Sequence, residues 1–140
     1  MIEVRLIETS AELSAAHNIR KEVFVIEQEC PEDIEWEFEE ESTHYLALEN
    51  NIPVGTSRWR YTADGIKMER FAVIKEMRGK NIGAALLLKM LSDTKQFNKT
   101  IYLHAQTHAA GFYEKYGFSA VGELFWEADI EHVKMKFTHY

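Results

Sequence analysis

The strand, loop and helix pattern between Met68 and Leu91 constrains the fold of this chain more than any other feature. Residues 66–74 alternate as a strand does, and the loop 78–83 that follows contains two glycines and two basic residues. The apolar residues after it recur at helical spacing: Ile82, Leu86, Leu87, Met90 and Leu91. A strand that passes through a short loop into an amphipathic helix is typical of α/β proteins.

The other apolar patterns complete a mixed sheet flanked by helices. Alternating residues predict further strands at 2–8, 44–50, 53–62, 100–105, 118–124 and 132–138. Thr9 has capping-box spacing to Glu12 and begins a helical pattern that runs to about residue 28. Another helix is predicted around 109–116, and Gly117 supplies the left-handed residue that often follows a helix. No linker or repeat divides the pattern, so one α/β domain over residues 1–140 is expected.

The distribution of charge narrows the function. The 140 residues carry 16 Lys and Arg and 23 Asp and Glu, a net charge of −7. Nine of the acids and none of the bases lie between Glu27 and Glu41, so the rest of the chain is almost neutral. A negative protein is poorly suited to the phosphate backbone of nucleic acids, which are not expected as partners.

The sequence predicts a cytoplasmic protein. Cys30 is the only cysteine, so no internal disulfide can form, which suits a reducing compartment. The first residues lack the basic-then-apolar pattern of a signal peptide. The apolar run 82–88 is too short to span a bilayer, so no membrane partner is expected.

The loop 78–83 has the chemistry of an anion site. The first amides of a helix have no intrahelical acceptor and carry a partial positive charge, and glycines let the main chain approach a ligand closely. The basic residues around the loop outnumber the acids: Lys75, Arg78, Lys80 and Lys89 against Glu76. The loop matches neither the P-loop nor the dinucleotide pattern, so an ordinary helix start with solvated basic residues stays an alternative.

Two motifs along the chain resemble the GNAT superfamily of N-acetyltransferases. The family's loop is Arg/Gln-x-x-Gly-x-Gly/Ala, and Arg78 and Gly83 match its first and last positions. Asn81 stands where the middle glycine is expected, and asparagine tolerates the left-handed conformation better than most residues. The family's later helix reads Asn-x-x-Ala-x-x-x-Tyr-x-x-x-Gly-Phe. This chain has Gln106 in place of the Asn and matches the other positions: Ala109, Tyr113, Gly117 and Phe118.

Two further segments resemble the small ElaA-type branch of that family: Arg20-x-x-Val23-Phe24-x-x-Glu27-Gln28 and Glu127-x-x-Ile130-x-His132. The resemblance covers most of the chain and implies a mostly antiparallel sheet of about seven strands, splayed between the fourth and the fifth. It also suggests a homodimer.

Acetyl-CoA is the co-substrate that the resemblance implies. The loop amides would hold its pyrophosphate, and the pantetheine arm would bond the main chain of 71–73. The coenzyme-binding residues implied are Phe71, Ala72, Val73, Arg78, Gly79, Lys80, Asn81, Ile82, Gly83, Ala84, Gln106 and Tyr113.

The implied reaction moves an acetyl group from this thioester to a primary amine. No activated Cys or Ser suggests an acyl-enzyme, so we expect direct attack in a ternary complex, without a metal. Tyr113 is the predicted general acid for the departing thiolate, with an aromatic core residue as the alternative interpretation. A non-enzymatic acyl-CoA-binding regulatory module on the same fold is the alternative function.

Glu69 is the predicted base. Strand periodicity would place Lys67, Glu69, Phe71 and Val73 on one face. Glu69 would then project beside the thioester and take the proton of the amine, directly or through water. An ion pair with Arg58 or Arg60 is an equally supported interpretation, and an amine already deprotonated by solvent is a third.

The acidic segment 27–41 suggests the kind of acceptor. In the family the segment after the first helix commonly lines the acceptor site, and here Trp36 and Phe38 are interleaved with acids. An acidic, aromatic segment at the edge of the acceptor site would attract a cationic amine: a small amine, a polyamine or a Lys side chain. The predicted acceptor-binding residues are Glu27, Trp36 and Glu69, and a solvated acidic face is the alternative interpretation.

The histidines form no recognisable metal motif. His104 and His108 are four residues apart, but the Glu of His-Glu-x-x-His is missing and a strand is expected to end near His104. His44 and His132 are expected at the cleft edge or in packing.

Overall fold

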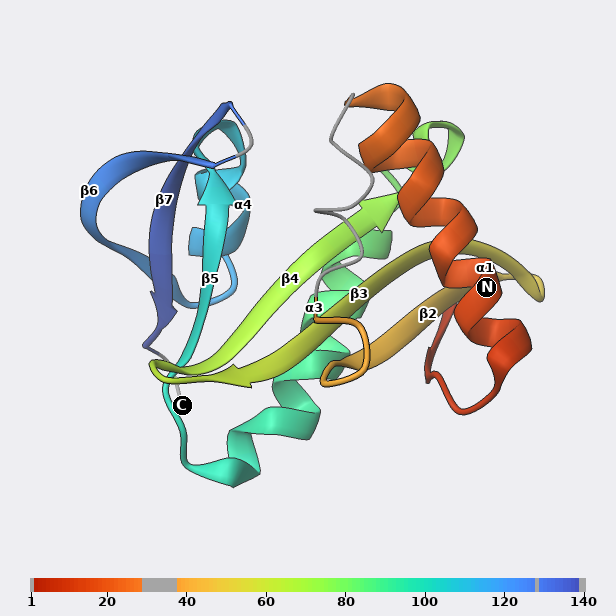
Figure 1. The fold of residues 1–140 in the computed structure, drawn as a ribbon, viewed down its shortest axis with the longest axis horizontal. Coiled ribbons are helices and arrows are strands. Elements are labelled where there is room, and N and C mark those ends of the chain that lie inside the picture. Colours follow the sequence, from red (N-terminus) through yellow and green to blue (C-terminus); the bar gives the residue numbers. More distant parts are fainter. Residues whose placement is uncertain (1, 29–37, 128, 139–140) are drawn as a thin grey trace.

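Seven strands form one sheet in the computed structural model, which describes residues 2–28, 38–127 and 129–138. They are β1 (Ile2–Leu6), β2 (Thr43–Glu49), β3 (Ile52–Thr62), β4 (Gly65–Val73), β5 (Ile101–Gln106), β6 (Phe118–Glu127) and β7 (Ile130–Phe137). The order across the sheet is β1-β2-β3-β4-β5-β7-β6 (Figure 1). All neighbours are antiparallel except β4 and β5, which are parallel, so the predicted mixed sheet is confirmed.

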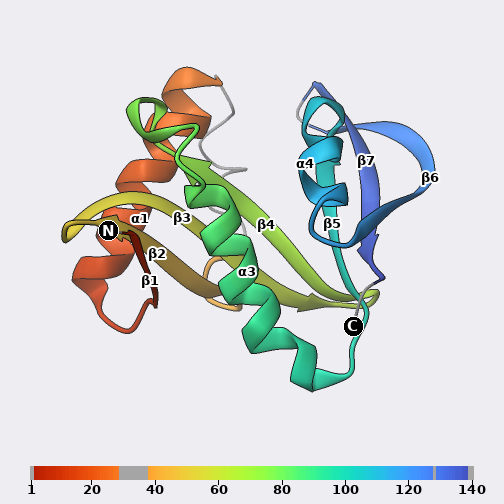
Figure 2. The same cartoon turned by 180° about the vertical axis from the view of Figure 1, so that it is seen from behind.

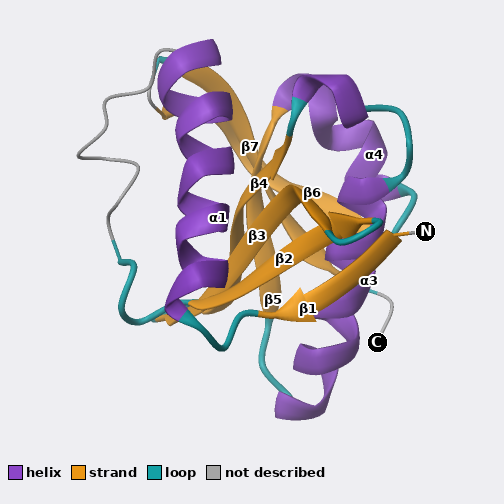
Figure 3. Cartoon of the chain, turned by 90° about the vertical axis from the view of Figure 1, so that its right-hand side faces the viewer, coloured by secondary structure: helices purple, strands orange, loops and turns teal. Residues whose placement is uncertain are grey.

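Helices cover both faces of this sheet. Helix α1 (Ser10–Arg20) continues directly into a π-helical segment (Lys21–Glu27) and lies on one face. Helices α3 (Ile82–Thr94) and α4 (Ala110–Glu114) lie on the other face (Figures 2 and 3). Short 3-10 turns complete the described helical structure: Lys75–Met77, Lys95–Phe97 and Thr107–Ala109. Within the described residues, no helix is long and apolar enough to cross a membrane.

Local signals set the helix ends. The Thr9 hydroxyl accepts a hydrogen bond from the Glu12 amide (3.1 Å), and the Glu12 carboxylate accepts one from the Thr9 amide (3.2 Å), which is the predicted capping box. Gly117 has φ 95°, as predicted for the residue that stops the last helix. Helix α4 (110–114) is shorter than the predicted 109–116, because residue 109 belongs to the 3-10 turn Thr107–Ala109 and residues 115–117 form a turn.

Each face of the sheet packs an apolar layer under its helices. The larger layer lies under α3 and α4 and includes Ile66, Met68, Leu86, Met90 and Leu103. The smaller layer lies under α1: Ala16, Ile19, Val23, Leu46, Leu48 and Ala72. A side chain that packs in one of these layers lies on the corresponding face of its strand.

Strands β4 and β5 are paired over only three residues. The register runs from Ile66 opposite Ile101 to Met68 opposite Leu103 and stops there. Beyond that point β4 remains paired with β3 and β5 remains paired with β7, and β4 and β5 diverge (Figure 1). The splay expected from the family resemblance is therefore present.

A bulge at Arg70 shifts the side-chain period of β4. Arg58 of β3 lies opposite Glu69 and Thr56 lies opposite Ala72, so β4 has one extra residue, and Arg70 has φ 57°. Beyond the bulge Ala72 packs under α1, whereas Phe71 and Val73 pack in the layer under α3 and α4. The expectation that Lys67, Glu69, Phe71 and Val73 share one face is therefore wrong, since Phe71 and Val73 face away from Glu69.

Gly65 at the start of β4 has no room for a side chain. Its φ is 133°, and a Cβ built there would lie 2.2 Å from the Thr100 carbonyl oxygen. That oxygen accepts the bond from the Ile66 amide (2.8 Å) beside the first β4–β5 pair. We expect Gly65→Ala to lower the free energy of unfolding by about 2–4 kcal/mol, measured by urea denaturation.

Gly111→Ala is the matched control for that substitution. Gly111 lies in α4 and its added Cβ would meet nothing within 4 Å, so a helical alanine should leave stability unchanged or raise it by up to ~1 kcal/mol. Equal unfolding free energies for the two variants would contradict the steric account of Gly65.

Candidate active site

The divergence of β4 from β5 opens a cleft of about 520 Å³. Its walls come from β4, β5, the end of the π-helical segment and the region of α4: they include Phe24, Gln28, Glu69, Phe71, His104, Gln106, Phe112 and Tyr113. Residues from both faces of the sheet reach this space, because Glu69 lies on the α1 face and Tyr113 packs on the other. The cleft thus connects the two faces between the strands.

The predicted anion loop forms a second hollow of about 260 Å³ at the start of α3. Gly79 (φ 84°) and Asn81 (φ 64°) are both left-handed, so asparagine takes the conformation expected of the family's middle glycine. The first bond of α3 runs from the Ala85 amide to the Asn81 carbonyl (3.0 Å), which leaves the amides of 82–84 without a helical acceptor. No side chain caps this helix start. The donor set fits an anionic group such as a pyrophosphate.

Arg78 and Glu27, predicted for the coenzyme and the acceptor respectively, bind each other. Arg78 donates two hydrogen bonds to the Glu27 carboxylate (2.7 and 2.9 Å) and one to the Val73 carbonyl (3.0 Å). The Arg78 guanidinium lowers the pKa of Glu27. The pair joins the end of the π-helical segment to the start of the anion loop, beside the cleft.

Tyr113 lies in α4 with its ring in the cleft wall. It makes edge-to-face contacts with Phe71 (5.9 Å between centroids) and Phe112 (5.1 Å), so its ring also packs as an aromatic core residue would. Burial raises the pKa of its hydroxyl, which keeps the proton in place at neutral pH. Gln106 ends β5 and lines the same cleft.

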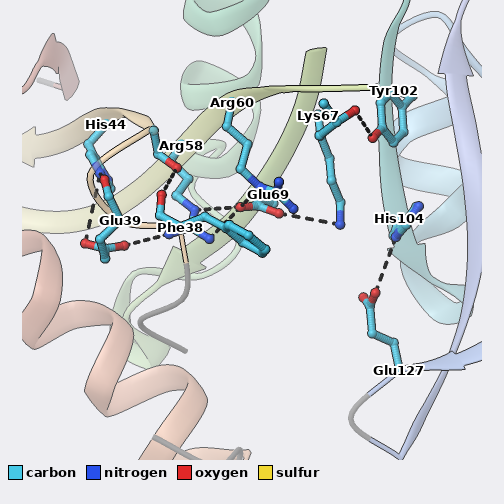
Figure 4. A network of polar contacts seen from close by, with 12 residues as sticks. Phe38, Glu39, His44, Arg58, Arg60, Lys67, Glu69, Tyr102, His104 and Glu127 are labelled. Carbon is cyan, nitrogen blue, oxygen red and sulfur yellow. Dashed lines mark hydrogen bonds and ion pairs between the residues drawn. The ribbon is translucent and has the colours of Figure 1, made fainter. Parts of the chain in front are cut away.

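Glu69 is buried in a cluster of cations (Figure 4). Its carboxylate accepts hydrogen bonds from Arg58 Nε (2.7 Å) and Arg60 Nε (3.0 Å), and Lys67 Nζ lies 3.5 Å away. Burial raises the pKa of Glu69, but these cations outweigh burial and the pKa is lowered. The ion-pair interpretation is confirmed for both arginines. The role of Glu69 as base stays a prediction, and a carboxylate held in this way is a weak proton acceptor.

Glu39 binds two buried arginines and a histidine. Its carboxylate contacts Arg20 Nη2, Arg58 Nη1 and His17 Nε2, each at 2.6 Å. Burial raises the pKa of Glu39, but the hydrogen bond and charge of Arg20 and the contacts with His17 and His44 lower it to about 2. The Glu39 charge is therefore neutralised within the protein rather than presented to an acceptor.

The acidic segment 27–41 lies partly within the described residues. Residues 29–37, with Trp36, lie outside the described residues. Phe38 follows them and lies over the Arg60 guanidinium (3.9 Å), while Glu40 and Glu41 are exposed. In the described part of the segment, then, Phe38 and Glu39 contact cations of the protein itself, whereas Glu40 and Glu41 are exposed.

The opposite wall of the cleft carries a group that sequence analysis did not bring together: His104, Glu127 and His132. His104 Nδ1 lies 3.4 Å from one Glu127 oxygen, and His132 Nε2 lies 3.8 Å from the other. Phe125 packs against both imidazoles, with centroids 4.9 and 5.9 Å away. The hydrogen bond from His104 and nearby cations lower the pKa of Glu127 to about 2. Alternation along β5 could place His104 on a face, but only the register of β6 and β7 brings Glu127 to it.

The residues of the site therefore lie on the two faces of the sheet. Phe71, Tyr113 and the anion loop lie with α3 and α4, whereas Glu69 and the His104–Glu127 pair lie with α1. His108 also lines the cleft. Among residues 2–28, 38–127 and 129–138, no group of three His, Cys, Asp or Glu side chains could hold a metal ion.

Comparison with known proteins shows the family of this chain. The family model described as an acetyltransferase (GNAT) domain matches residues 8–139. The chain belongs to the GNAT acetyltransferase family. It is therefore classed as an acetyltransferase, and the resemblance drawn from the two motifs is confirmed.

Relatives in this family match the chain over nearly its whole length. YjcF of Bacillus subtilis, named as an uncharacterised N-acetyltransferase, is 35% identical over 128 residues, which cover 89% of this chain and 91% of YjcF. The structure of an acyl-CoA N-acyltransferase from Pseudomonas aeruginosa has a TM-score of 0.87 at 27% identity and covers 99% of this chain and all of its own. Escherichia coli ElaA has a TM-score of 0.85 at 28% identity with the same coverage, in line with the ElaA-type segments.

The lowered pKa of Glu39 predicts an acid-sensitive contribution to stability. Ionised Glu39 is favoured in the folded protein, so its contribution, about 3 kcal/mol, is complete above pH 4.5 and is lost as the pH falls toward 2. We expect Glu39→Gln to lower the free energy of unfolding by about this amount at pH 7. The difference from the unsubstituted protein should shrink below pH 4.5, as measured by denaturant unfolding at several pH values.

Glu40→Gln is the control, because Glu40 is exposed and its substitution should change stability by less than about 0.5 kcal/mol. A Glu39→Gln variant that unfolds like this control at pH 7 would show that the cluster does not depend on the carboxylate.

Proposed function

We propose that this protein transfers the acetyl group of acetyl-CoA to a primary amine by direct attack within a ternary complex. The observation that carries the proposal is the cleft between β4 and β5, which joins an anion loop and a partly buried tyrosine on one face to charged groups on the other. Two substrates can therefore enter from opposite faces and meet between the strands. Membership of the acetyltransferase family supports the reaction class.

Coenzyme A is proposed to lie on the side of α3 and α4. The free amides of 82–84 and the left-handed Gly79 and Asn81 suit its pyrophosphate. The pantetheine arm would follow 71–73, where β4 has no partner on its β5 side. Arg78, the first residue of the loop, is hydrogen-bonded to Glu27 and Val73, and Lys80 of the same loop is exposed.

Gly83 tests the position of the pyrophosphate. A Cβ at Gly83 would meet only Phe112, at 3.9 Å, so a side chain fits the protein but narrows the hollow above the loop amides. We expect Gly83→Val to raise the Kd of acetyl-CoA by about tenfold or more, about 1.4 kcal/mol, in isothermal titration calorimetry.

Leu88→Val places the same β-branched residue on an exposed position of the same helix and should bind acetyl-CoA as the unsubstituted protein does. Unchanged affinity in Gly83→Val would place the pyrophosphate elsewhere.

The chemical step needs an oxyanion site and a proton for the leaving thiolate. As the amine nitrogen attacks the thioester carbonyl carbon, an amide N–H of 71–73 can donate to the developing oxyanion, an interaction worth about 3 kcal/mol. When the C–S bond breaks, the Tyr113 hydroxyl can protonate the thiolate, because Tyr113 stays protonated at neutral pH and lines the cleft.

The acceptor is proposed to approach from the α1 face. Glu69 lies there, and Glu27 lies beside the anion loop. With Trp36 they remain the predicted acceptor-binding residues. A cationic amine is favoured: a small amine, a polyamine or a Lys side chain.

Tyr113→Phe tests the general acid. A thiolate can leave without help, so we expect kcat to fall by about 10²-fold rather than to vanish, while the Kd of acetyl-CoA stays unchanged. The measurement is release of free coenzyme A with putrescine, spermidine, Nα-acetyl-lysine, glycine and 2-phenylethylamine. Tyr116→Phe is the control, because its ring packs against Phe112 nearby and has no assigned role.

Turnover that is unchanged in Tyr113→Phe would overturn the acid assignment but not the reaction. Acetyl-CoA binding without turnover on any amine of the panel would favour a regulatory acyl-CoA-binding module instead.

A further inference from the structure

We propose that the imidazole of His104, oriented by Glu127, takes the proton from the attacking amine. This inference rests on the proposed acetyl transfer and adds a catalytic residue on the acceptor side of the cleft. It also assigns Glu127 a positioning role and replaces Glu69 as the base.

His104 stands where the two strands separate. Leu103 and Met68 form the last β4–β5 pair, so His104 and Glu69 are the next residues on the two strands, one on each wall of the cleft. Tyr102 is paired with Lys67, and side chains two residues apart share a face, so both His104 and Glu69 lie on the α1 face. An amine that enters from this face reaches the thioester between them.

The Glu127 carboxylate sets the orientation of the His104 ring. Nδ1 donates to Glu127 Oε1 (3.4 Å), and Phe125 and Tyr102 pack against the ring at 4.9 and 5.8 Å between centroids. A neutral imidazole that carries its proton on Nδ1 has a free lone pair on Nε2, the nitrogen that can accept a proton. The His104 side chain is 24% exposed and lines the cleft, so a substrate in the cleft can reach the imidazole.

Glu69 is the less suitable base of the two. Its carboxylate already accepts from Arg58 and Arg60 and lies near Lys67, and it is buried. Protonation would leave these cations without their shared counter-ion, which is costly in a buried site. Glu127, in contrast, binds the imidazole, and the imidazole can take up a proton while keeping its partner.

The proton and electron balance of the step is complete. The ammonium form of the acceptor first loses one proton to solvent. The neutral amine nitrogen then forms a bond to the carbonyl carbon, the carbonyl electron pair moves to oxygen, and Nε2 of His104 takes one further proton from the nitrogen. The carbonyl re-forms as the C–S bond breaks, and Tyr113 gives one proton to the thiolate. Solvent then takes the proton from the His104 imidazolium and reprotonates Tyr113, so the products are the amide and free coenzyme A.

The titratable and charged groups around His104 come from several elements. From β4 they are Lys67 and Glu69, from β6 Glu127, from β7 His132 and Lys134, and from the turn before α4 His108. Glu127 is the one that contacts the ring and stabilises the imidazolium. Its removal should therefore move the acidic fall in activity to lower pH.

The test measures kcat/KM for the best amine of the panel from pH 5.5 to 9 in four variants. We expect His104→Gln to lower kcat/KM by about 10²- to 10⁴-fold and to lose the acidic limb, with an unchanged Kd for acetyl-CoA by calorimetry. Glu127→Gln should keep partial activity and show its acidic limb at lower pH. His108→Gln, a histidine of the same cleft without a Glu127 contact, should behave like the unsubstituted protein.

Glu69→Gln separates the two candidate bases. If Glu69→Gln, with the native far-UV circular dichroism spectrum, loses the acidic limb while His104→Gln keeps it, the inference is overturned and Glu69 is the base. Acetyl-CoA binding without turnover in the unsubstituted protein would overturn the proposed function and this inference together, whereas an unchanged kcat/KM in His104→Gln overturns this inference alone.

Nitrogen-15 NMR of the imidazole adds a readout that does not depend on activity. We expect neutral His104 to show the Nδ1–H tautomer, and this preference should be lost in Glu127→Gln. An Nε2–H tautomer in the unsubstituted protein would contradict the proposed orientation.

Discussion

The three-residue pairing between β4 and β5 is the constraint on which the rest of the site depends. After Met68 and Leu103 the strands separate, so the β5 side of β4 has main-chain groups without a strand partner. Such an internal edge is costly unless something hydrogen-bonds to it, and the polar pantetheine arm would provide those bonds. Gly65 makes the close approach possible at one end, and the anion loop lies beside Val73 at the other end of β4. Sheet topology and the proposed coenzyme site therefore have one cause.

The bulge at Arg70 then divides the chemistry between the two faces. Without it, Glu69 and Phe71 would point the same way. With it, Phe71 joins Tyr113 on the side of α3 and α4, and Glu69 joins the charged groups under α1. A general acid for the thiolate and a base for the amine need to reach opposite ends of the reacting group. One extra residue in β4 separates them in this way, at the cost of a left-handed non-glycine residue.

Local sequence signals predicted the helices and strands, whereas the set of residues that meet in the site depends on the register between strands that are distant in the sequence. The capping box at Thr9, the left-handed Asn81 and Gly117, and the apolar face of α3 each act within a few residues, so the sequence reveals them. The bulge carries no such mark, because arginine is an unusual residue at positive φ. His104 and Glu127 are 23 residues apart and meet only through the β5–β7–β6 register. Their pairing could not be predicted from spacing.

The role of an acidic residue likewise depends on its tertiary contacts. Glu39 and Glu69 could serve a cationic acceptor or the protein's own cations, and composition cannot distinguish these uses. In the structure Arg20 and Arg58 are almost fully buried, and buried guanidinium groups require counter-ions close by. Both carboxylates serve as these counter-ions, and their ion pairs link β3, β4 and α1 beside the cleft. A group that must change protonation during turnover is better separated from such a structural cluster, and His104, on the opposite wall with a carboxylate of its own, meets that condition.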